Sequence, residues 1–344
     1  MYTVFIKFII CAGIIVVAGR RVARYGDVIA EKTGLGGLWV GLILVSVATS
    51  LPELFAGVGS ILFVKVPDLT VGNLFGANSY NLLNIALLAL IYRARTRGRS
   101  LLADVSKGEL MVAGSSLVPL TIAALGILCA VNGIYAPQIA GVDAFSIAIL
   151  AAYLGLTYLI FRFEKTEQSI KKEEKLLEEK YGDISLKKAY KGYAIAAVAI
   201  IASGIWLSYI GDEISRSLAL EQSFTGSLFL GLATTLPEIT VSIAALLIGA
   251  REIAIANMFG SNLFNMAILF IDDALYREAP LFRAVSSEHI LTACIVMVMT
   301  TIVIIAMAIK PKVKPIPSQG WNGFWYIPAL VIIFCVGTYI NFIK

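Results

Sequence analysis

The chain has 344 residues, of which 58% are hydrophobic and 15% are charged, and its mean hydropathy is +0.84. This composition excludes an ordinary water-soluble protein and predicts an integral membrane protein with many spans. The formal net charge of +5 therefore bears on membrane topology and does not indicate a nucleic-acid-binding surface.

Ten apolar runs approach or exceed the roughly 20 residues that a helix needs to cross the hydrocarbon core of a bilayer. They cover residues 3–19, 37–63, 70–92, 109–131, 140–161, 192–210, 223–249, 252–275, 287–309 and 322–343. The first run is followed by Gly19-Arg20-Arg21 and lacks the small-residue cleavage site of a signal peptide, so we expect it to be a membrane helix.

Two polar motifs interrupt the apolar runs, and each occurs twice. The second run contains Ala48-Thr49-Ser50-Leu51-Pro52-Glu53, and the seventh contains Ala233-Thr234-Thr235-Leu236-Pro237-Glu238. The third run contains the sequence GNLFGANSYN at 72–81, and the eighth contains ANMFGSNLFN at 256–265. The copies are 185 residues apart at the prolines and 184 apart at the glycines, which indicates a duplicated unit.

The positions of the Lys and Arg residues predict the orientation of the spans, because cytoplasmic loops carry the positive excess. If the N-terminus lies outside, 22 of these residues fall in cytoplasmic segments and 5 in external ones, with Lys7 left in the first helix. We therefore expect a cell-membrane protein with both termini outside and the central loop in the cytoplasm.

The motif copies lie five spans apart, so the two copies must enter the membrane in opposite directions. The sequence predicts an all-α membrane protein with ten transmembrane helices arranged as two inverted repeats of five helices. The expected division is a first repeat at 1–162, a solvated cytoplasmic linker at 163–190 rich in Lys and Glu, and a second repeat at 191–344.

The motif in the second and seventh runs supplies oxygen atoms at membrane depth. Proline cannot donate a backbone hydrogen bond, so Pro52 frees the carbonyl of Ala48 and Pro237 frees that of Ala233. Hydroxyl groups lie beside each freed carbonyl and a glutamate follows each proline; these residues are Thr49, Ser50 and Glu53 in the first copy and Thr234, Thr235 and Glu238 in the second. Ionisable groups at this depth cost roughly 2.5–3.5 kcal/mol each and are usually retained for function.

Oxygen ligands without nearby Cys or His suit hard cations. Two glutamates match the charge of one Ca²⁺, and the same oxygens could hold Na⁺. On the neighbouring helices, Asn81 follows Ala77 and Asn265 follows Ser261 by four residues, so each pair shares a helix face. Asn78 and Asn262 lie between these positions, where they could bond the freed backbone or clamp the helices together.

Asp272 and Asp273 lie near the outer end of the eighth run. They fit an interfacial helix end better than an external vestibule that captures cations. Neither a zinc-type His motif nor a Gly-X-Ser-X-Gly elbow occurs in the sequence, so we do not expect an enzyme.

The duplicated motifs resemble the two alpha repeats of the cation/Ca²⁺ exchanger superfamily, and they are most similar to Na⁺/Ca²⁺ exchangers of prokaryotic type. The resemblance implies a secondary antiporter that exports Ca²⁺ in exchange for Na⁺, in which the first and sixth helices slide across a rigid core. It implies that Glu53 and Glu238 bind Ca²⁺ directly. The other implied ligands of Na⁺ or Ca²⁺ are the carbonyls of Ala48 and Ala233, the hydroxyls of Thr49, Ser50, Thr234, Thr235 and Ser261, and the side chains of Asn81 and Asn265.

The chain departs from the family pattern at two positions, where Ala77 replaces a common Ser and Asn265 replaces a common Asp. These changes remove one hydroxyl and one carboxylate, which leaves H⁺ open as the driving ion and a Ca²⁺/H⁺ antiporter as the alternative. A cation channel fits less well, because it would need a continuous pore and usually a symmetric oligomer. We expect no cofactor, with Ca²⁺ and Na⁺ or H⁺ as transported ions, lipid as the surroundings, no nucleic-acid partner and a monomeric state.

Overall fold

The computed structural model describes residues 2–103, 105–174, 181, 183–217, 231–309 and 324–343, and it is almost entirely helical. Its first half contains α1 (Tyr2–Thr33), the interrupted segment α2 (Gly37–Trp39), η1 (Val40–Val45), α3 (Ser46–Thr49), α4 (Leu51–Gly59) and η2 (Ser60–Val64), then α5 (Pro67–Arg95), α6 (Lys107–Val131) and α7 (Ala144–Glu174). Its second half contains α8 (Leu186–Ser217), α10 (Gly231–Thr234), α11 (Leu236–Leu247), α12 (Arg251–Leu275), α13 (Leu281–Ala284), α14 (Glu288–Ala308) and α15 (Tyr326–Ile343). A short hairpin of β1 (Gln138–Ile139) and β2 (Val142–Asp143) precedes α7.

These helices correspond to the ten predicted spans, but several extend beyond them. Helix α1 continues to Thr33, and α7 continues to Glu174. Charged residues at these ends are unfavourable in hydrocarbon but remain compatible with a helix outside it. The predicted linker at 163–190 is therefore helical over 163–174 and again from Leu186, while its residues 175–180 and 182 lie outside the described part. Positions 223–230 and 322–323, at the starts of the seventh and tenth predicted spans, also lie outside it.

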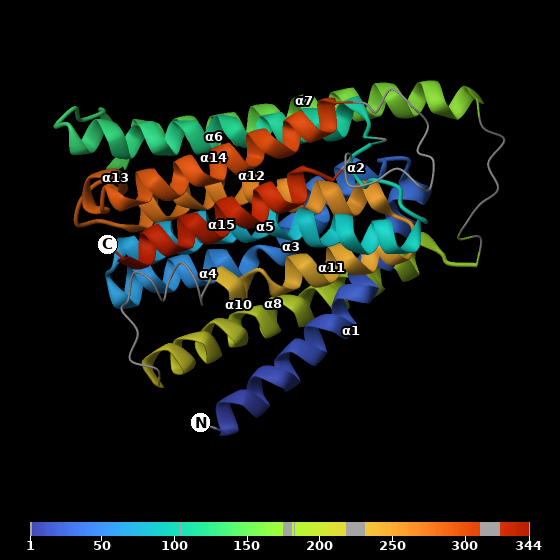
Figure 1. The fold of residues 1–344 in the computed structure, drawn as a ribbon, viewed down its shortest axis with the longest axis horizontal. Helices are drawn as coiled ribbons and strands as arrows, with labels where there is room; N and C mark the ends of the chain where they lie inside the picture. Colours follow the sequence, from blue (N-terminus) through green and yellow to red (C-terminus); the bar gives the residue numbers. More distant parts are fainter. Residues whose placement is uncertain are drawn as a thin grey trace.

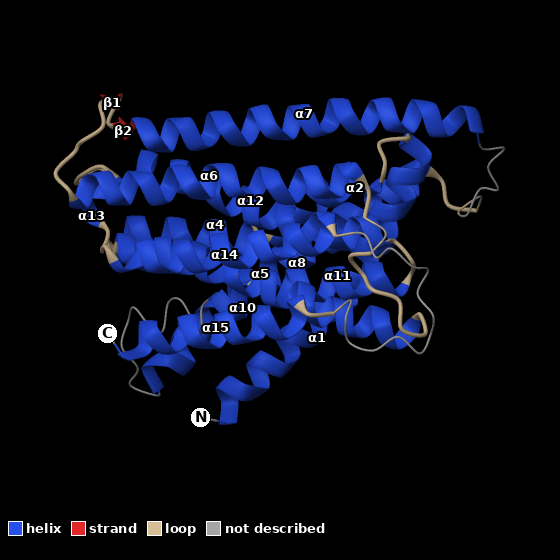
Figure 2. Cartoon of the chain, turned by 45° about the horizontal axis from the view of Figure 1, so that its top comes forward, coloured by secondary structure: helices blue, strands red, loops and turns tan. Residues whose placement is uncertain are grey.

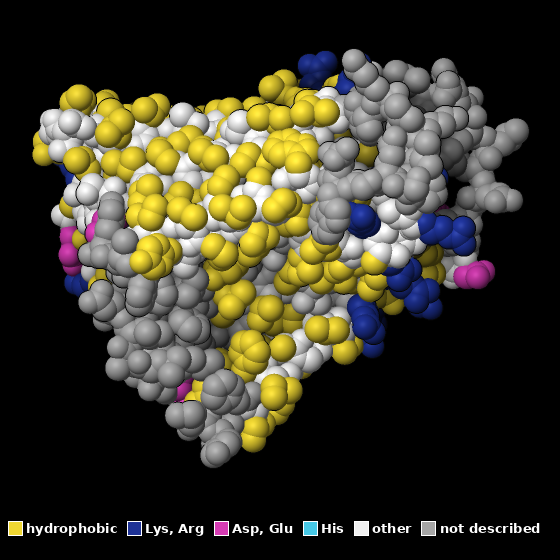
Figure 3. Space-filling model, viewed as in Figure 1, with side chains coloured by type: hydrophobic (Ala, Val, Ile, Leu, Met, Phe, Trp, Pro, Cys, Tyr) yellow, Lys and Arg dark blue, Asp and Glu magenta, His cyan; other side chains and the backbone are white. Residues whose placement is uncertain are grey.

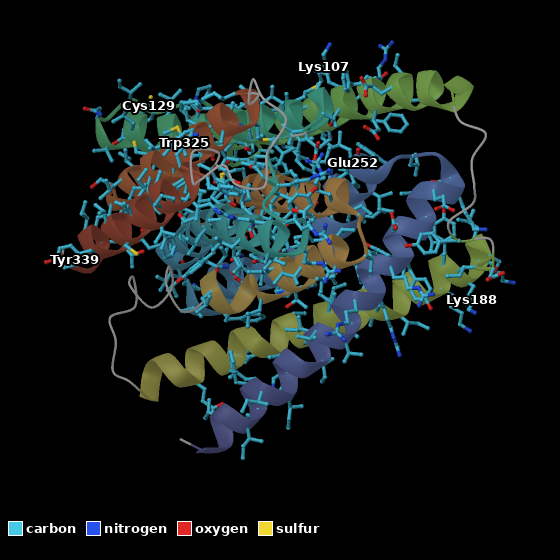
Figure 4. The ribbon with its side chains drawn as sticks, turned by 45° about the vertical axis from the view of Figure 1, so that its right-hand side comes forward. Lys107, Cys129, Lys188, Glu252, Trp325 and Tyr339 are labelled. Atoms are coloured by element: carbon cyan, nitrogen blue, oxygen red, sulfur yellow. The ribbon has the colours of Figure 1, made fainter. Side chains whose placement is uncertain are left out.

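Successive segments run in opposite directions, so that α1 begins and α15 ends at the same end of the bundle (Figure 1). Lys188 lies towards one end of the molecule and Tyr339 towards the other (Figure 4). Most of the Lys and Arg residues visible in Figure 3 gather at one end, and hydrophobic side chains cover the middle. This distribution matches a protein that crosses a bilayer.

The helices that carry the repeated motifs lie in the centre. Among the spanning helices, α12 and α5 are the most buried, whereas α7 lies at the outside of the bundle opposite α1 (Figure 2). Helices α1 and α8 pack together beside the rest of the bundle (Figure 1). Tight contacts occur at glycines in this pair: a Cβ on Gly192 of α8 would lie 2.3 Å from the ring of Tyr25 of α1.

A cluster at the Lys- and Arg-rich end joins the two halves. Ser106 and Glu109 form a capping box at the start of α6, in which each side chain accepts a hydrogen bond from the other residue's backbone. The Arg251 guanidinium, at the start of α12, forms an ion pair with Glu109 at 3.1 Å and donates to the carbonyl of Leu101 at 2.8 Å. These contacts hold the first turns of α6 and α12 together.

Candidate cation-binding site

The central feature is a pair of broken helices, one in each half of the chain. The first break lies at Ser50, between α3 and α4, and the second at Thr235, between α10 and α11. At each break, the half-helix that follows has a proline in its first turn. A proline is tolerated there because the first backbone N–H groups of a helix have no acceptor within the helix. The breaks therefore place two helix N-termini, with their partial positive charge, in the interior.

Glu53 and Glu238 occupy the first turns of these half-helices, and both are 0% exposed. Ser50 from the first half donates a hydrogen bond to Oε1 of Glu238 in the second, at 2.9 Å. Both carboxylate oxygens of Glu53 and Oε2 of Glu238 lack a hydrogen-bond partner. The two carboxylates lie close enough to repel each other when both are charged.

Two threonine–asparagine pairs also form hydrogen bonds between the two halves of the chain. The Thr49 hydroxyl lies 3.2 Å from Oδ1 of Asn257, and the Thr234 hydroxyl lies 3.3 Å from Oδ1 of Asn73. Asn257 also donates through Nδ2 to the backbone carbonyl of Glu238 at 3.2 Å. The predicted set of ligands omitted both asparagines, although their matching places in GNLFGANSYN and ANMFGSNLFN provided a signal.

The asparagines on α5 and α12 meet across the centre of the molecule. Nδ2 of Asn81 donates to Oδ1 of Asn262, and Nδ2 of Asn265 donates to Oδ1 of Asn78, both at 3.0 Å. Asn78 and Asn262 also contact each other's backbone carbonyls at 3.5 Å. Of the two predicted roles for Asn78 and Asn262, the contacts support clamping of α5 against α12.

The structure brings the predicted ligands together in one buried region, where several oxygens remain free. Oδ1 of Asn81, Oδ1 of Asn265 and Oγ of Ser261 have no hydrogen-bond partner. Ala48 and Ala233, whose carbonyls were predicted to be freed, lie in the buried turns directly before the breaks. Gly260 lets α12 pack closely against η1, since a Cβ on this residue would lie 2.8 Å from the carbonyl oxygen of Leu42.

The donor set defines which ions the region suits. Its groups are carboxylate, amide, hydroxyl and backbone oxygens, and no group of three or more His, Cys, Asp or Glu residues with metal-binding geometry occurs among the described residues. Carboxylate and carbonyl oxygens favour hard cations over metals that prefer thiolate or imidazole. Unpartnered buried oxygens are costly, and a hard cation would satisfy them.

Comparisons with known proteins show the family and the fold of this chain. The sequence model of the family described as Sodium/calcium exchanger protein matches residues 3–172 and 189–343. The inner membrane protein YrbG of Escherichia coli (strain K12) is 26% identical over 260 residues, which cover 74% of this chain and 74% of YrbG.

Solved structures of the sodium-calcium exchanger NCX_Mj share the fold. The structure soaked with 2.5 mM Na⁺ and 0.1 mM Sr²⁺ has a TM-score of 0.64 at 17% identity, covering 96% of this chain and 97% of that chain. The structure soaked with zero Na⁺ and Ca²⁺ has a TM-score of 0.63 at 16% identity, covering 97% and 99%. This likeness confirms the predicted all-α membrane fold of ten helices in two inverted repeats.

Proposed function

This multi-pass membrane protein belongs to the sodium/calcium exchanger protein family, and we propose that it exports Ca²⁺ from the cytoplasm in exchange for Na⁺ by alternating access. The observation that carries the proposal is the buried pair of Glu53 and Glu238 at two facing helix breaks, with three of their four carboxylate oxygens unpartnered. Among the described residues neither glutamate forms an ion pair with a basic side chain, so two buried negative charges need positive charge, and one Ca²⁺ supplies it.

In this proposal the remaining ligands come from both halves of the chain. Oxygens around the two carboxylates raise the count towards the 6 to 8 that Ca²⁺ prefers. The contributing groups are the carbonyls of Ala48 and Ala233, the hydroxyls of Thr49, Ser50, Thr234, Thr235 and Ser261, and the amide oxygens of Asn81 and Asn265.

Coupling follows from competition for the same carboxylates. When Na⁺ occupies Glu53 and Glu238, Ca²⁺ is displaced, and the reverse also holds. An empty pair of charged glutamates opposes the movement between outward-open and inward-open states, because the charges would have to cross an apolar barrier unpaired. Counter-transport of Ca²⁺ and Na⁺ is therefore favoured over uncoupled movement of either ion.

The packing of α1 and α8 beside the bundle supports their role as the moving element. The excess of Lys and Arg at one end supports a cytoplasmic location for that end, by the positive-inside rule. In this orientation the termini lie outside, and an inward Na⁺ gradient would drive Ca²⁺ out of the cytoplasm.

A Ca²⁺/H⁺ antiporter is the second candidate, and the sequence at two positions favours it. Ala77 lacks the hydroxyl and Asn265 lacks the carboxylate that the family pattern commonly places there. Fewer Na⁺ ligands would leave protonation of Glu53 and Glu238 as the way to displace Ca²⁺.

The deciding experiment measures uptake of radioactive Ca²⁺ into proteoliposomes that contain the purified protein, with Na⁺, K⁺ and pH gradients imposed in turn. We expect the Na⁺ gradient to drive uptake. Uptake with the pH gradient alone would select the second candidate, and flux that needs no counter-ion would contradict both.

In the same assay, Glu53→Gln and Glu238→Gln are expected to abolish Ca²⁺ exchange, because each removes a charged ligand while keeping the side-chain shape. Glu278→Gln is the matched control, since Glu278 is 53% exposed and pairs with Lys65 at the surface. Near wild-type exchange by either central variant would show that the carboxylates are not the ligands.

A further inference from the structure

A buried carboxylate outside the central site has no assigned role. Asp272, near the end of α12, is 0% exposed. Its Oδ2 accepts a hydrogen bond from the Thr70 hydroxyl at 2.5 Å, and its Oδ1 has no hydrogen-bond partner. Within the part of the chain that the structure describes, Asp272 forms no ion pair with a basic side chain. A buried, uncompensated charge costs several kcal/mol, so Asp272 either takes up a proton or is neutralised by a cation from elsewhere.

The adjacent Asp273 illustrates what a purely structural carboxylate looks like at the same helix end. Its Oδ2 accepts from the backbone nitrogen of Asp143 at 2.8 Å, and its Oδ1 accepts from that of Leu281 at 2.7 Å. Both oxygens of Asp273 therefore hold neighbouring backbone in place. Asp272 has no such backbone partner on Oδ1, so anchoring the helix end does not account for it.

Asp272 lies beside the helix that carries Glu53. It follows Asn265 by seven residues, which places both on the same face of α12 about two turns apart. On α4, Gly57 lies one turn beyond Glu53. A Cβ on Gly57 would lie 2.7 Å from the Thr70 hydroxyl oxygen and 2.8 Å from Oδ2 of Asp272. The carboxylate and hydroxyl thus occupy the notch left by Gly57, one helical turn from the central carboxylate.

This outer pair has no counterpart in the other half of the chain. The repeat offset of 184 residues relates Asp272 to Leu88 and Thr70 to Ala254, and both of these residues are buried and apolar. The central site is duplicated, whereas the Asp272–Thr70 pair exists only on the side with few Lys and Arg residues. Under the proposed orientation, that is the external side.

We propose that Asp272 and Thr70 form a second cation site, which holds one Na⁺ on its way between the external solution and Glu53 and Glu238. A single carboxylate with a neutral hydroxyl balances the charge of a monovalent cation, whereas Ca²⁺ would remain under-neutralised there. The inference rests on the proposed function for the identity of the ion and for the direction of the path.

The test compares the two faces of the membrane. Right-side-out and inside-out vesicles containing wild-type protein or the Asp272→Asn variant are assayed for Na⁺-driven Ca²⁺ flux over a range of Na⁺ concentrations. We expect the variant to raise the apparent KM for Na⁺ at least about tenfold at the external face, because it removes the charged ligand of the proposed site and even the loss of an outer partner of a ligand costs about 10–100-fold in metal affinity. The cytoplasmic KM should be unchanged. Thr70→Val should raise the external KM in the same direction by less.

Two controls keep the test decisive. Exchange of Ca²⁺ for Ca²⁺ without Na⁺ should be equal in the variant and the wild type, which shows that the variant is folded and its central site works. Asp68→Asn removes a charge at the same end of the molecule from a side chain that is 38% exposed, and it should not shift the KM.

An unchanged external KM in Asp272→Asn would overturn the inference, because Asp272 would then be a permanently protonated structural group. An equal shift at both faces, or the same shift in Asp68→Asn, would also overturn it. Failure of the proposed function is a distinct result, since the wild type would then show no Na⁺-driven flux.

Discussion

At the residue scale, three side-chain contacts at the centre pair one half of the chain with the other. Ser50 reaches Glu238, Thr49 reaches Asn257, and Thr234 reaches Asn73. The burial of these hydroxyls and carboxylates at the helix breaks could be predicted from sequence, because proline, hydroxyls and glutamate stand together in one motif. The roles of Asn73 and Asn257 could not, because they depend on which helix of the opposite half each amide faces.

Asn257→Ala tests this supporting role. The change removes the contacts with the Thr49 hydroxyl and the backbone carbonyl of Glu238, so the ligands should be held less firmly. We expect the apparent KM for Ca²⁺ to rise about tenfold with exchange still detectable, measured as Ca²⁺ flux in proteoliposomes. Asn341→Ala, at the distant end of α15, is the control and should have an unchanged KM. Equal values for the two variants would refute the assignment.

At the scale of elements, α1 and α8 contact the motif helices through a pair of glycines related by the repeat. Gly19 and Gly204 are 185 residues apart, the same offset as the two prolines. A Cβ on Gly204 would lie 2.1 Å from Cγ of Pro52, and one on Gly19 would lie 3.0 Å from Cγ2 of Thr240. Each helix of the outer pair therefore packs closely on a motif-bearing segment of the opposite half.

Gly204→Ala should slow transport without altering ion binding. The added methyl group must displace the ring of Pro52, which obstructs movement of α8 past the helix break. We expect the maximal rate of Ca²⁺ exchange to fall several-fold while the apparent KM for Ca²⁺ stays near the wild-type value. The matched control is Gly155→Ala in α7, where a Cβ would meet nothing within 4 Å. A wild-type rate in Gly204→Ala would argue against sliding at this contact.

The sequence predicted the number and order of the elements better than their lengths or local geometry. Apolar runs mark where a helix crosses hydrocarbon, so they predicted all ten spans, but α1 continues through Arg20 to Thr33 beyond the apolar part. The breaks at Ser50 and Thr235 followed from the prolines. The π-helical turns η1 and η2 had no such signal, because their apolar residues suit an ordinary α-helix equally well.

At the scale of the whole molecule, the asymmetric distribution of Lys and Arg predicts which end faces the cytoplasm. A membrane-impermeant maleimide should label Glu278→Cys in intact cells, and it should label Lys107→Cys only after the membrane is opened. Both positions are exposed, and they lie at opposite ends of the bundle, because Lys107 begins α6 beside the start of α12 whereas Glu278 follows the end of α12. The native protein provides the background control, because its own four cysteines are free. The reverse labelling pattern would overturn the proposed orientation and place Asp272 on the cytoplasmic side.

The crossed hydrogen bonds between Ser50, Thr49 and Thr234 and their partners have a consequence for how such a centre can be assembled. Neither half holds a complete set of binding groups. A polypeptide with only five helices could form the centre only as a dimer of two copies inserted in the membrane in opposite orientations. Such a chain could have no preferred membrane orientation. Joining the halves in one chain removes that requirement, so each half can carry its own charge bias and one side can acquire features, such as Asp272, that the other lacks.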